Sequence, residues 1–183
     1  GPSLCSVALT PATHTVAINS AALSGLEFDI WCCQDSPTNF EQTLRVFTRD
    51  RATVTVWCRE RFAERWAALG FSVSPHADAE SMFRYNFIDN PALVSYTRST
   101  ITVALARIVH AGARQISLHG VDMQGMNYSF GKDARNRGSD QWQTRWTKEK
   151  TALKLAVKQW EKTAKVKFNY NGLWKNGCDV ITT

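Results

Sequence analysis

A histidine, an aspartate and a tyrosine follow the end of a stretch typical of a buried strand, in LHGVDMQGMNYSFG at 118–131. His119 could act as a general base, because imidazole titrates near neutral pH. Asp122 could bind ribose hydroxyls or accept N–H groups of its own loop. Tyr128 could stabilise a departing phosphate through its hydroxyl. The alternative is that all three only turn the chain or pack on it, and the sequence leaves both interpretations open.

A second candidate lies at the start of a predicted helix over 99–113, which is apolar nearly all round. Ser99 or Thr100 is a plausible N-cap, and the free N–H groups of a helix N-terminus favour a phosphate. Arg98, just before them, could add a bidentate donor to such a phosphate. Simple capping by Ser99 and Thr100, with a solvated Arg98, is the alternative.

A third candidate is a series of basic residues on and before the long helix predicted over 144–164. Lysines recur there at every fourth position, and arginines precede them: Lys150, Lys154, Lys158 and Lys162, with Arg135, Arg137 and Arg145. The opposite stripe, Trp146, Leu153, Val157, Trp160 and Ala164, is apolar and predicts a core-facing surface. The basic residues could follow the phosphates of DNA, RNA or another polyanion, or could be a solvated helix face. The polar segment 131–146 resembles a mobile flap that could close over a nucleotide.

Short apolar strands alternate with helical patterns along the chain and would position these groups. Strands are predicted over 14–19, 27–33, 52–58, 114–120 and 165–170, and helices over 40–50, 59–70, 99–113 and 144–164. This alternation predicts an α/β fold with a Rossmann-like, mainly parallel sheet flanked by helices, forming a single domain over 1–183. The segment 73–93 has no clear period and is predicted to be a loop. Ligands of such sheets bind at the carboxyl ends of the strands, here near Asn19, Asp35, Gly120 and Asp122.

The composition of the chain limits the kinds of partner and cellular compartment that these candidate residues can have. The 183 residues are 44% hydrophobic and 21% charged, with a net charge of +6 that permits an acidic partner. The five cysteines are scattered and lack zinc-site spacing, which favours reduced, buried thiols in the cytoplasm. No apolar run is long enough for a membrane span, no metal motif is present, and no metal cofactor is expected. Oligomeric state cannot be read from the sequence.

Several motifs together resemble one protein family: GPSL (1–4), VAINSA (16–21), FDIWCCQDS (28–36), RSTITVALARIVHAGARQISLHGVDM (98–123) and NYSFG (127–131). Their order is similar to that in the bacterial lipooligosaccharide sialyltransferases and the related domains grouped with motility-accessory and pterin-pyrophosphokinase-like proteins. In that family a strand precedes the turn that GPSL matches, so the resemblance implies a further strand before Gly1. If GPSL is not a motif, the leading Gly-Pro is a protease scar.

The resemblance implies a Rossmann-like domain that needs no metal and binds a nucleotide-activated sugar, which is of the cytidine type in the sialyltransferases. We therefore predict a metal-independent glycosyltransferase that transfers the sugar to an acceptor, either a glycan or, because of the basic residues, a nucleic acid. The resemblance places Ser3 in the phosphate-side turn, Asn19 near the base, ribose or sugar, and Tyr128 beside the leaving phosphate, which Arg145 would help to neutralise. The family's catalytic histidine follows the tyrosine, whereas this chain has no histidine after His119, and Lys148 falls near that place. A non-catalytic nucleotide- or nucleic-acid-binding module is therefore one alternative. Another is a DNA-modifying transferase of the kind bacteriophages carry.

Overall fold

The computed structural model describes residues 14–24, 27–76, 100–119, 127–128, 131–132 and 139–171. Parallel strands alternate with helices, so the chain has the predicted α/β fold. It divides into two compact units, Pro11–Arg107 and a unit that holds Ile108–Thr183, and the division falls inside one helix. Each unit is described by itself below, and the single domain over 1–183 stays a prediction.

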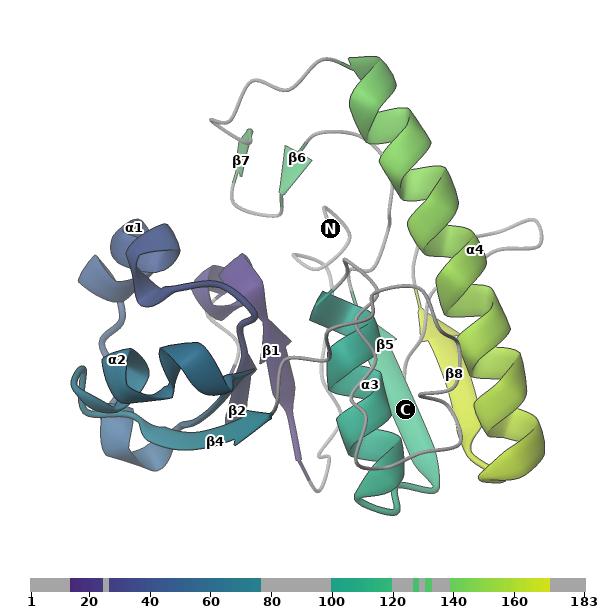
Figure 1. The fold of residues 1–183 in the computed structure, drawn as a ribbon, viewed down its shortest axis with the longest axis horizontal. Coiled ribbons are helices and arrows are strands. Elements are labelled where there is room, and N and C mark those ends of the chain that lie inside the picture. The colour runs from purple at the N-terminus through teal and green to yellow at the C-terminus, as the bar shows by residue number, and fades with distance from the viewer. Residues whose placement is uncertain are drawn as a thin grey trace. The chain divides into compact units, whose positions relative to one another are not determined.

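The first unit contains a four-stranded parallel sheet (Figure 1). Its strands are β1 (Val16–Ile18), β2 (Ile30–Cys32), β3 (Thr55–Arg59) and β4 (Ser72–His76). They lie in the order β1-β2-β3-β4, which is also their order along the chain. Because all four run in the same direction, the residues that follow β1, β2, β3 and β4 share the carboxyl edge of the sheet.

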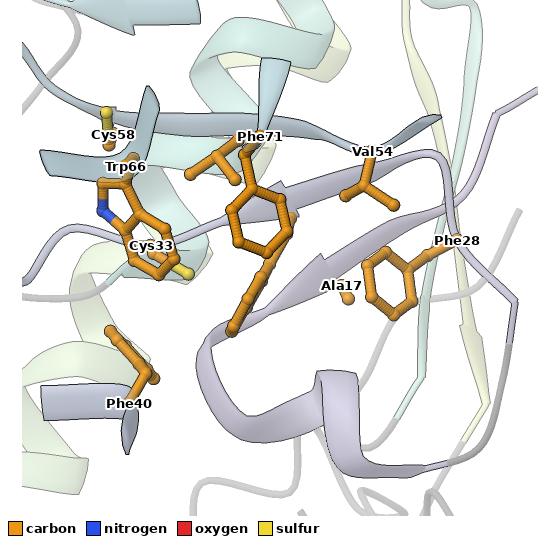
Figure 2. Packing of buried hydrophobic residues seen from close by; sticks show 10 residues of the cluster. Ala17, Phe28, Cys33, Phe40, Val54, Cys58, Trp66 and Phe71 are labelled. Atoms are coloured by element: carbon orange, nitrogen blue, oxygen red, sulfur yellow. The ribbon is translucent and has the colours of Figure 1, made fainter. Parts of the chain in front are cut away.

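Short helical segments lie between the strands, and some of them cover one face of the sheet with aromatic side chains. The helical segments are η2 (Asn19–Ser24), η3 (Pro37–Phe40), α1 (Glu41–Arg45), η4 (Arg51–Thr53), η5 (Glu60–Phe62) and α2 (Ala63–Ala67). Trp66 of α2 and Phe40 of η3 pack with Phe71, Val56 and Cys58 in one buried cluster (Figure 2). Aromatic rings bury more apolar area than other side chains, so this cluster is the main core of the unit.

The opposite face of the sheet contacts α3 (Thr100–His110). Successive side chains of a strand point to opposite faces, so Trp57 points away from the cluster that holds Val56 and Cys58. The Arg107 guanidinium of α3 lies 4.4 Å from the Trp57 ring centroid and donates to Ser74, the register partner of Trp57. Residues 101–106 of α3 are all buried, as expected for a helix that is apolar nearly all round.

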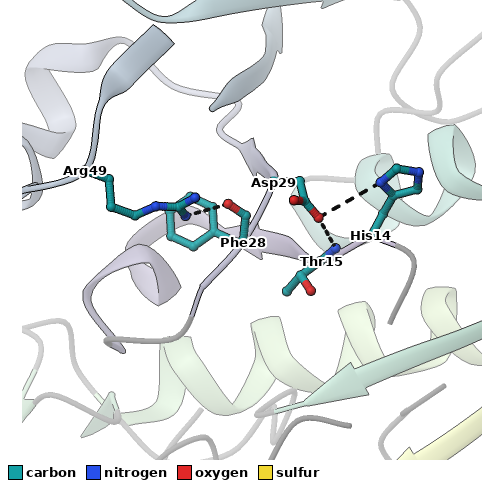
Figure 3. A network of polar contacts seen from close by, with 5 residues as sticks. All are labelled: His14, Thr15, Phe28, Asp29 and Arg49. Carbon is teal, nitrogen blue, oxygen red and sulfur yellow. Dashed lines mark hydrogen bonds and ion pairs between the residues drawn. The ribbon is translucent and has the colours of Figure 1, made fainter. Parts of the chain in front are cut away.

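Polar contacts fix β1 and β2 at their amino ends, opposite the carboxyl edge (Figure 3). Thr15 N donates to Asp29 Oδ2 at 2.8 Å, and His14 Nδ1 lies 4.0 Å from the same oxygen. Arg49 donates to the Phe28 carbonyl, and its guanidinium lies 4.8 Å from the Phe28 ring centroid. These contacts set the register of β1 and β2 and are not part of the carboxyl edge.

The second unit pairs two parallel strands and contains the longest helix. The strands are β5 (Gln115–His119) and β8 (Lys167–Asn171), the helix is α4 (Ser139–Thr163), and β6 (Asn127–Tyr128) and β7 (Gly131–Lys132) form a short antiparallel pair. The predicted core positions Leu153, Val157 and Trp160 are buried, and Trp160 stacks on Phe168 of β8 at 6.3 Å. The apolar stripe of the predicted helix therefore packs as expected.

Most boundaries differ from those predicted by a few residues, and the helices predicted over 40–50 and 59–70 are shorter, since α1 is Glu41–Arg45 and α2 is Ala63–Ala67. Three further differences change an element. The predicted loop 73–93 begins with four residues of β4, which the sequence hides because Pro75 argues against a strand; a proline is tolerated here because β4 is an edge strand of this sheet. The helix predicted to begin at 144 begins at Ser139, so the last eight residues of the predicted flap 131–146 are helical. Residues 127–128 and 131–132, predicted as loop, form the β6–β7 pair.

Candidate functional site

Asn19 is the first residue after β1 at the carboxyl edge, and its conformation is unusual. Its φ is +50°, a left-handed conformation that asparagine adopts more readily than most residues. Trp31 Nε1 donates to the Asn19 carbonyl at 2.7 Å, and Asn19 Nδ2 donates to Thr100 Oγ1 at 3.1 Å. Both the backbone and the side chain of Asn19 are therefore held in place.

The side-chain oxygen of Asn19 has no hydrogen-bond partner among the described residues. This atom, Oδ1, is buried as well. A buried polar atom left unpaired costs about 1–3 kcal/mol, which a ligand donor would recover. A hydroxyl or amino group of a ligand could supply that hydrogen bond.

Thr100 places the amino end of α3 at the same point. The first four N–H groups of a helix lack an acceptor within the helix, and the aligned peptide dipoles leave partial positive charge there. Thr102, in the same first turn, is 1% exposed, and its Oγ1 has no partner in the described part of the chain. The predicted pair Asn19 and Thr100 thus meet, although they are 81 residues apart.

The chain returns to β1 at this point after leaving the sheet at its other edge. The last strand before α3 among the residues that the structure describes is β4, and Thr100 of α3 lies beside Asn19 at the end of β1. In parallel α/β sheets, ligands bind at the carboxyl edge where the chain reverses its course across the sheet. The contact between Asn19 and Thr100 marks such a reversal.

A second polar cluster at the sheet was missed from the sequence. His76 Nε2 donates to Gln34 Oε1 at 2.8 Å, which leaves His76 Nδ1 to accept from Arg107 Nη1 at 3.4 Å. Arg107 also donates to the carbonyl and hydroxyl of Ser74, at 2.8 and 2.7 Å. Burial lowers the pKa of Arg107. Because these polar groups hydrogen-bond to one another, we assign the cluster a structural role: it holds together the residues at the ends of β2 and β4 and the helix α3.

The buried cysteines of the first unit are unreactive thiols. Cys32, Cys33 and Cys58 are free and fully buried. Burial raises the pKa of Cys32 to about 12 and that of Cys58 to about 11, and it raises the pKa of Cys33 as well. Because the thiolate is the nucleophilic form, none of the three is suited to catalysis at neutral pH. The expectation of reduced, buried thiols is confirmed for these three residues.

His119 ends β5 in the second unit, as the sequence predicted. It lies on the same strand face as Ser117, and both His119 Nδ1 and Ser117 Oγ are buried and unpaired within the described residues. Burial lowers the pKa of His119 from its ordinary value of 6.5. The imidazole is therefore neutral at pH 7 and able to accept a proton, as a general base must be.

This lowered pKa makes stability depend on pH. The unfolded chain protonates His119 near pH 6.5, whereas the folded chain resists protonation, so stability falls as pH drops from 6.5 through the folded pKa. We expect the midpoint of thermal unfolding to fall less between about pH 7 and about pH 5 in His119→Gln than in the natural chain. Melting curves across this range provide the measurement. Parallel pH profiles for the two proteins would contradict the assignment.

For most of the remaining predicted site residues, the structure describes only the backbone or does not describe the residue. Asp35 is exposed and follows β2 at the carboxyl edge, while Tyr128 lies in β6 and Arg145 in α4, with both of their side chains outside the described residues. Outside the described residues altogether lie Ser3, Arg98, Ser99, Gly120, Asp122, Arg135 and Arg137. Arg145 belongs to a helix and not to a flap, because α4 begins six residues before it.

The predicted lysine series is only partly an outward ridge. Lys158 is exposed, Lys154 is partly buried, and the Lys150 side chain is outside the described residues. A spacing of four residues drifts around a helix with 3.6 residues per turn, so the lysines do not stay on one line. Among the α4 lysines whose exposure the structure describes, Lys158 and Lys162 are exposed, and both lie near the carboxyl end of the helix.

The described ranges contain neither a metal-binding cluster nor a membrane-spanning helix. Among those residues, no group of three or more His, Cys, Asp or Glu side chains is placed to hold a metal ion. Of the helices described there, none is long and apolar enough to cross a membrane. No protein-family model, curated protein or solved structure matches the chain.

Proposed function

We propose that the chain binds the phosphates of a nucleotide-activated sugar at the amino end of α3, beside Asn19. The observation that carries the proposal is the hydrogen bond between Asn19 Nδ2 and Thr100 Oγ1. It joins the carboxyl end of a parallel strand to a helix N-terminus, a combination that favours a bound phosphate. The unpaired Asn19 Oδ1 would accept a hydrogen bond from the base, ribose or sugar.

The proposed reaction is metal-independent transfer of the sugar to an acceptor. The bond between the anomeric carbon and the phosphate oxygen breaks, and an acceptor hydroxyl oxygen bonds to that carbon and passes its proton to a general base, the role predicted for His119. The leaving phosphate gains negative charge, which N–H groups at a helix N-terminus stabilise without a metal ion. His119, Tyr128 and Arg145 remain the catalytic candidates that the sequence predicts. We place this function in the cytoplasm, where free buried thiols such as those of the first unit persist.

A nucleotide panel tests the binding step. We expect at least one nucleotide sugar of cytidine, uridine, guanosine or adenosine, with one or two phosphates, to raise the thermal midpoint by about 5 °C, at concentrations about 100-fold above its dissociation constant. Differential scanning fluorimetry with matched concentrations of inorganic phosphate as control measures the shift. If no nucleotide shifts the midpoint more than phosphate does, the binding proposal is wrong.

A non-catalytic nucleotide-binding module of the same fold is the second candidate, favoured by the absence of any histidine after His119. Release of free sugar from the nucleotide sugar that binds in the panel separates the two functions. Slow hydrolysis that Tyr128→Phe abolishes, with nucleotide affinity retained, would support the transferase. Affinity without hydrolysis would support the binding module.

A further inference from the structure

Arg59 ends β3 and brings a buried cation to the carboxyl edge of the four-stranded sheet. The residue is 8% exposed, whereas arginine side chains in proteins are mostly exposed. Arg61, two positions further along the chain, is exposed. Removing a guanidinium from water costs free energy that acceptor atoms have to recover. The fold therefore holds Arg59 in particular at the edge where ligands of parallel sheets bind.

The alternation of side chains along β3 gives the direction of the Arg59 side chain. Val56 and Cys58 belong to the aromatic cluster on one face of the sheet. Trp57 and Arg59 point to the other face, because successive side chains of a strand alternate. The Arg107 guanidinium of α3 lies 4.4 Å from the Trp57 ring centroid on that face. Arg59 therefore projects from the face of the sheet that α3 contacts.

The side chains beside Arg59 are polar and carry no negative charge. His76 of β4 is the register partner of Arg59. Its Nε2 lies 2.8 Å from Gln34 Oε1, so side chains from the ends of β2 and β4 meet across β3. His76 Nδ1 lies 3.4 Å from Arg107 Nη1. The acceptor atoms of Gln34 and His76 are thus engaged by other donors, and neither side chain neutralises the Arg59 charge.

The ionisable groups at the ends of β2 and β3 add little negative charge. Burial raises the pKa of Cys32 to about 12 and that of Cys58 to about 11, so both thiols keep their protons at neutral pH. Asp35 and Glu60, the acids that follow β2 and β3 in the chain, are exposed, and water and salt screen their charges. This part of the carboxyl edge is therefore suited to an anion.

The guanidinium of Arg59 keeps hydrogen-bonding capacity for a ligand. Arg59 interacts with other residues of the chain, yet its buried Nε donates to no acceptor within the described ranges. A guanidinium has five N–H donors in a planar arrangement that matches the oxygens of a phosphate. Contacts within the protein therefore leave donors that a phosphate can use.

The amino end of α3 lies at the same edge of the sheet as Arg59. Thr100, the first residue of α3, accepts a hydrogen bond from Asn19 at the end of β1. Arg107, about 10 Å further along the helix axis, reaches Trp57 in the middle of β3. The strands β1 and β3 are two positions apart in the sheet, or about 10 Å. The long side chain of Arg59 and a phosphate group together can span that distance.

We infer that Arg59 binds the phosphate oxygens of the ligand at the carboxyl edge, opposite the N–H groups of the first turn of α3. The assignment rests on the proposed function and names the side chain that neutralises the charge of the leaving phosphate. A guanidinium and a helix N-terminus together supply positive charge without a metal ion. Arg107 has a different role, because it already donates to Ser74 and contacts His76.

Isothermal titration of the full chain tests this role with two probes. The probes are the nucleotide sugar identified by the panel and inorganic pyrophosphate. Arg59→Gln should weaken the binding of both at least about 10-fold, because charge-assisted hydrogen bonds are lost. Arg59→Lys keeps the charge but not the planar pair of donors, so it should recover part of the affinity.

Arg49→Gln is the matched control. Arg49 donates to the Phe28 carbonyl at the amino ends of the strands, opposite the proposed phosphate site. Its replacement removes the same charge from the same unit and should leave the affinity for both probes unchanged. Thermal melts accompany the titrations. If Arg59→Gln lacks a cooperative transition, Arg59→Lys takes its place, and it should melt cooperatively while it binds pyrophosphate more weakly than the natural chain does.

Three outcomes distinguish this inference from the proposed function. Equal affinity of the natural chain and the Arg59 variant for the nucleotide sugar would overturn the inference and leave the nucleotide proposal intact. An equal loss of affinity in Arg49→Gln would also overturn it, since the effect would then be general. Pyrophosphate binding that depends on Arg59, without binding of any nucleotide sugar, would support the phosphate site and contradict the proposed function.

Discussion

Replacement of Trp31 by alanine is expected to lower the free energy of unfolding by about 3–5 kcal/mol. Trp31 is fully buried and meets four aromatic rings. Its ring centroid lies 5.2–5.7 Å from those of Phe40, Phe47, Trp66 and Phe71. Alanine would leave a cavity among rigid rings that cannot close over it. The loss is a large part of the 5–15 kcal/mol by which a typical domain is stabilised. Part of the Trp31→Ala protein is therefore expected to be unfolded and to show no cooperative unfolding transition.

Denaturant titration followed by circular dichroism measures this effect, with two further variants for comparison. Val46→Ala alters a side chain that is 61% exposed and should change the free energy of unfolding by less than about 0.5 kcal/mol. Trp31→Phe keeps an aromatic ring but removes the Nε1 donor to the Asn19 carbonyl, so we expect an intermediate loss of stability together with weaker nucleotide binding. Equal stability of Trp31→Ala and Val46→Ala would contradict the core described here.

Asn19→Asp is expected to weaken nucleotide binding at least about 10-fold while leaving the fold intact. The new carboxylate would lie beside Thr100 at the amino end of α3, where the helix dipole favours a negative charge. The same charge repels a phosphate from that position. In Asn19→Asp the free energy of unfolding should therefore stay the same or rise while nucleotide affinity falls. General damage to the fold would lower both.

Isothermal titration with the nucleotide sugar identified by the panel measures the affinity, and a thermal melt measures stability. Asn169→Asp makes the same chemical change at an exposed position of β8 and should retain the affinity of the natural chain. Unchanged affinity in Asn19→Asp, or an equal loss in Asn169→Asp, would remove Asn19 from the site.

Local patterns predicted most of the elements because their signals are short in range. The strands that became β1, β2, β3, β5 and β8 are β-branched or aromatic, and α3 and α4 carry apolar faces with the helical period. The strand β4 was missed because Pro75 masks it, and only its position at the edge of the sheet explains how that proline is accommodated. Whether a strand lies at the edge of a sheet depends on which strands pair with it, and a short stretch of sequence does not contain that information.

The candidate site was predictable only where a single residue follows a strand or begins a helix. Asn19 and Thr100 met both conditions, and the structure joins them. Gln34, His76 and Arg107 were not found, because each pairs with a residue 31 to 42 positions away and His76 belongs to the strand that was missed. Likewise the hydrogen bond from Arg114 to the Ala164 carbonyl joins residues 50 positions apart, so no local pattern predicts it.

The central claim is that a nucleoside phosphate binds where β1 ends and α3 begins. Its most direct test is a titration of the isotopically labelled full chain with the nucleotide sugar, followed by the amide resonances in two-dimensional NMR. We expect saturable shifts that are largest at the side-chain amide of Asn19 and at the backbone amides of Thr100, Ile101 and Thr102. Saturable shifts confined to residues outside β1, Asn19 and α3, or no saturable shift at all, would show that the phosphate site is not there.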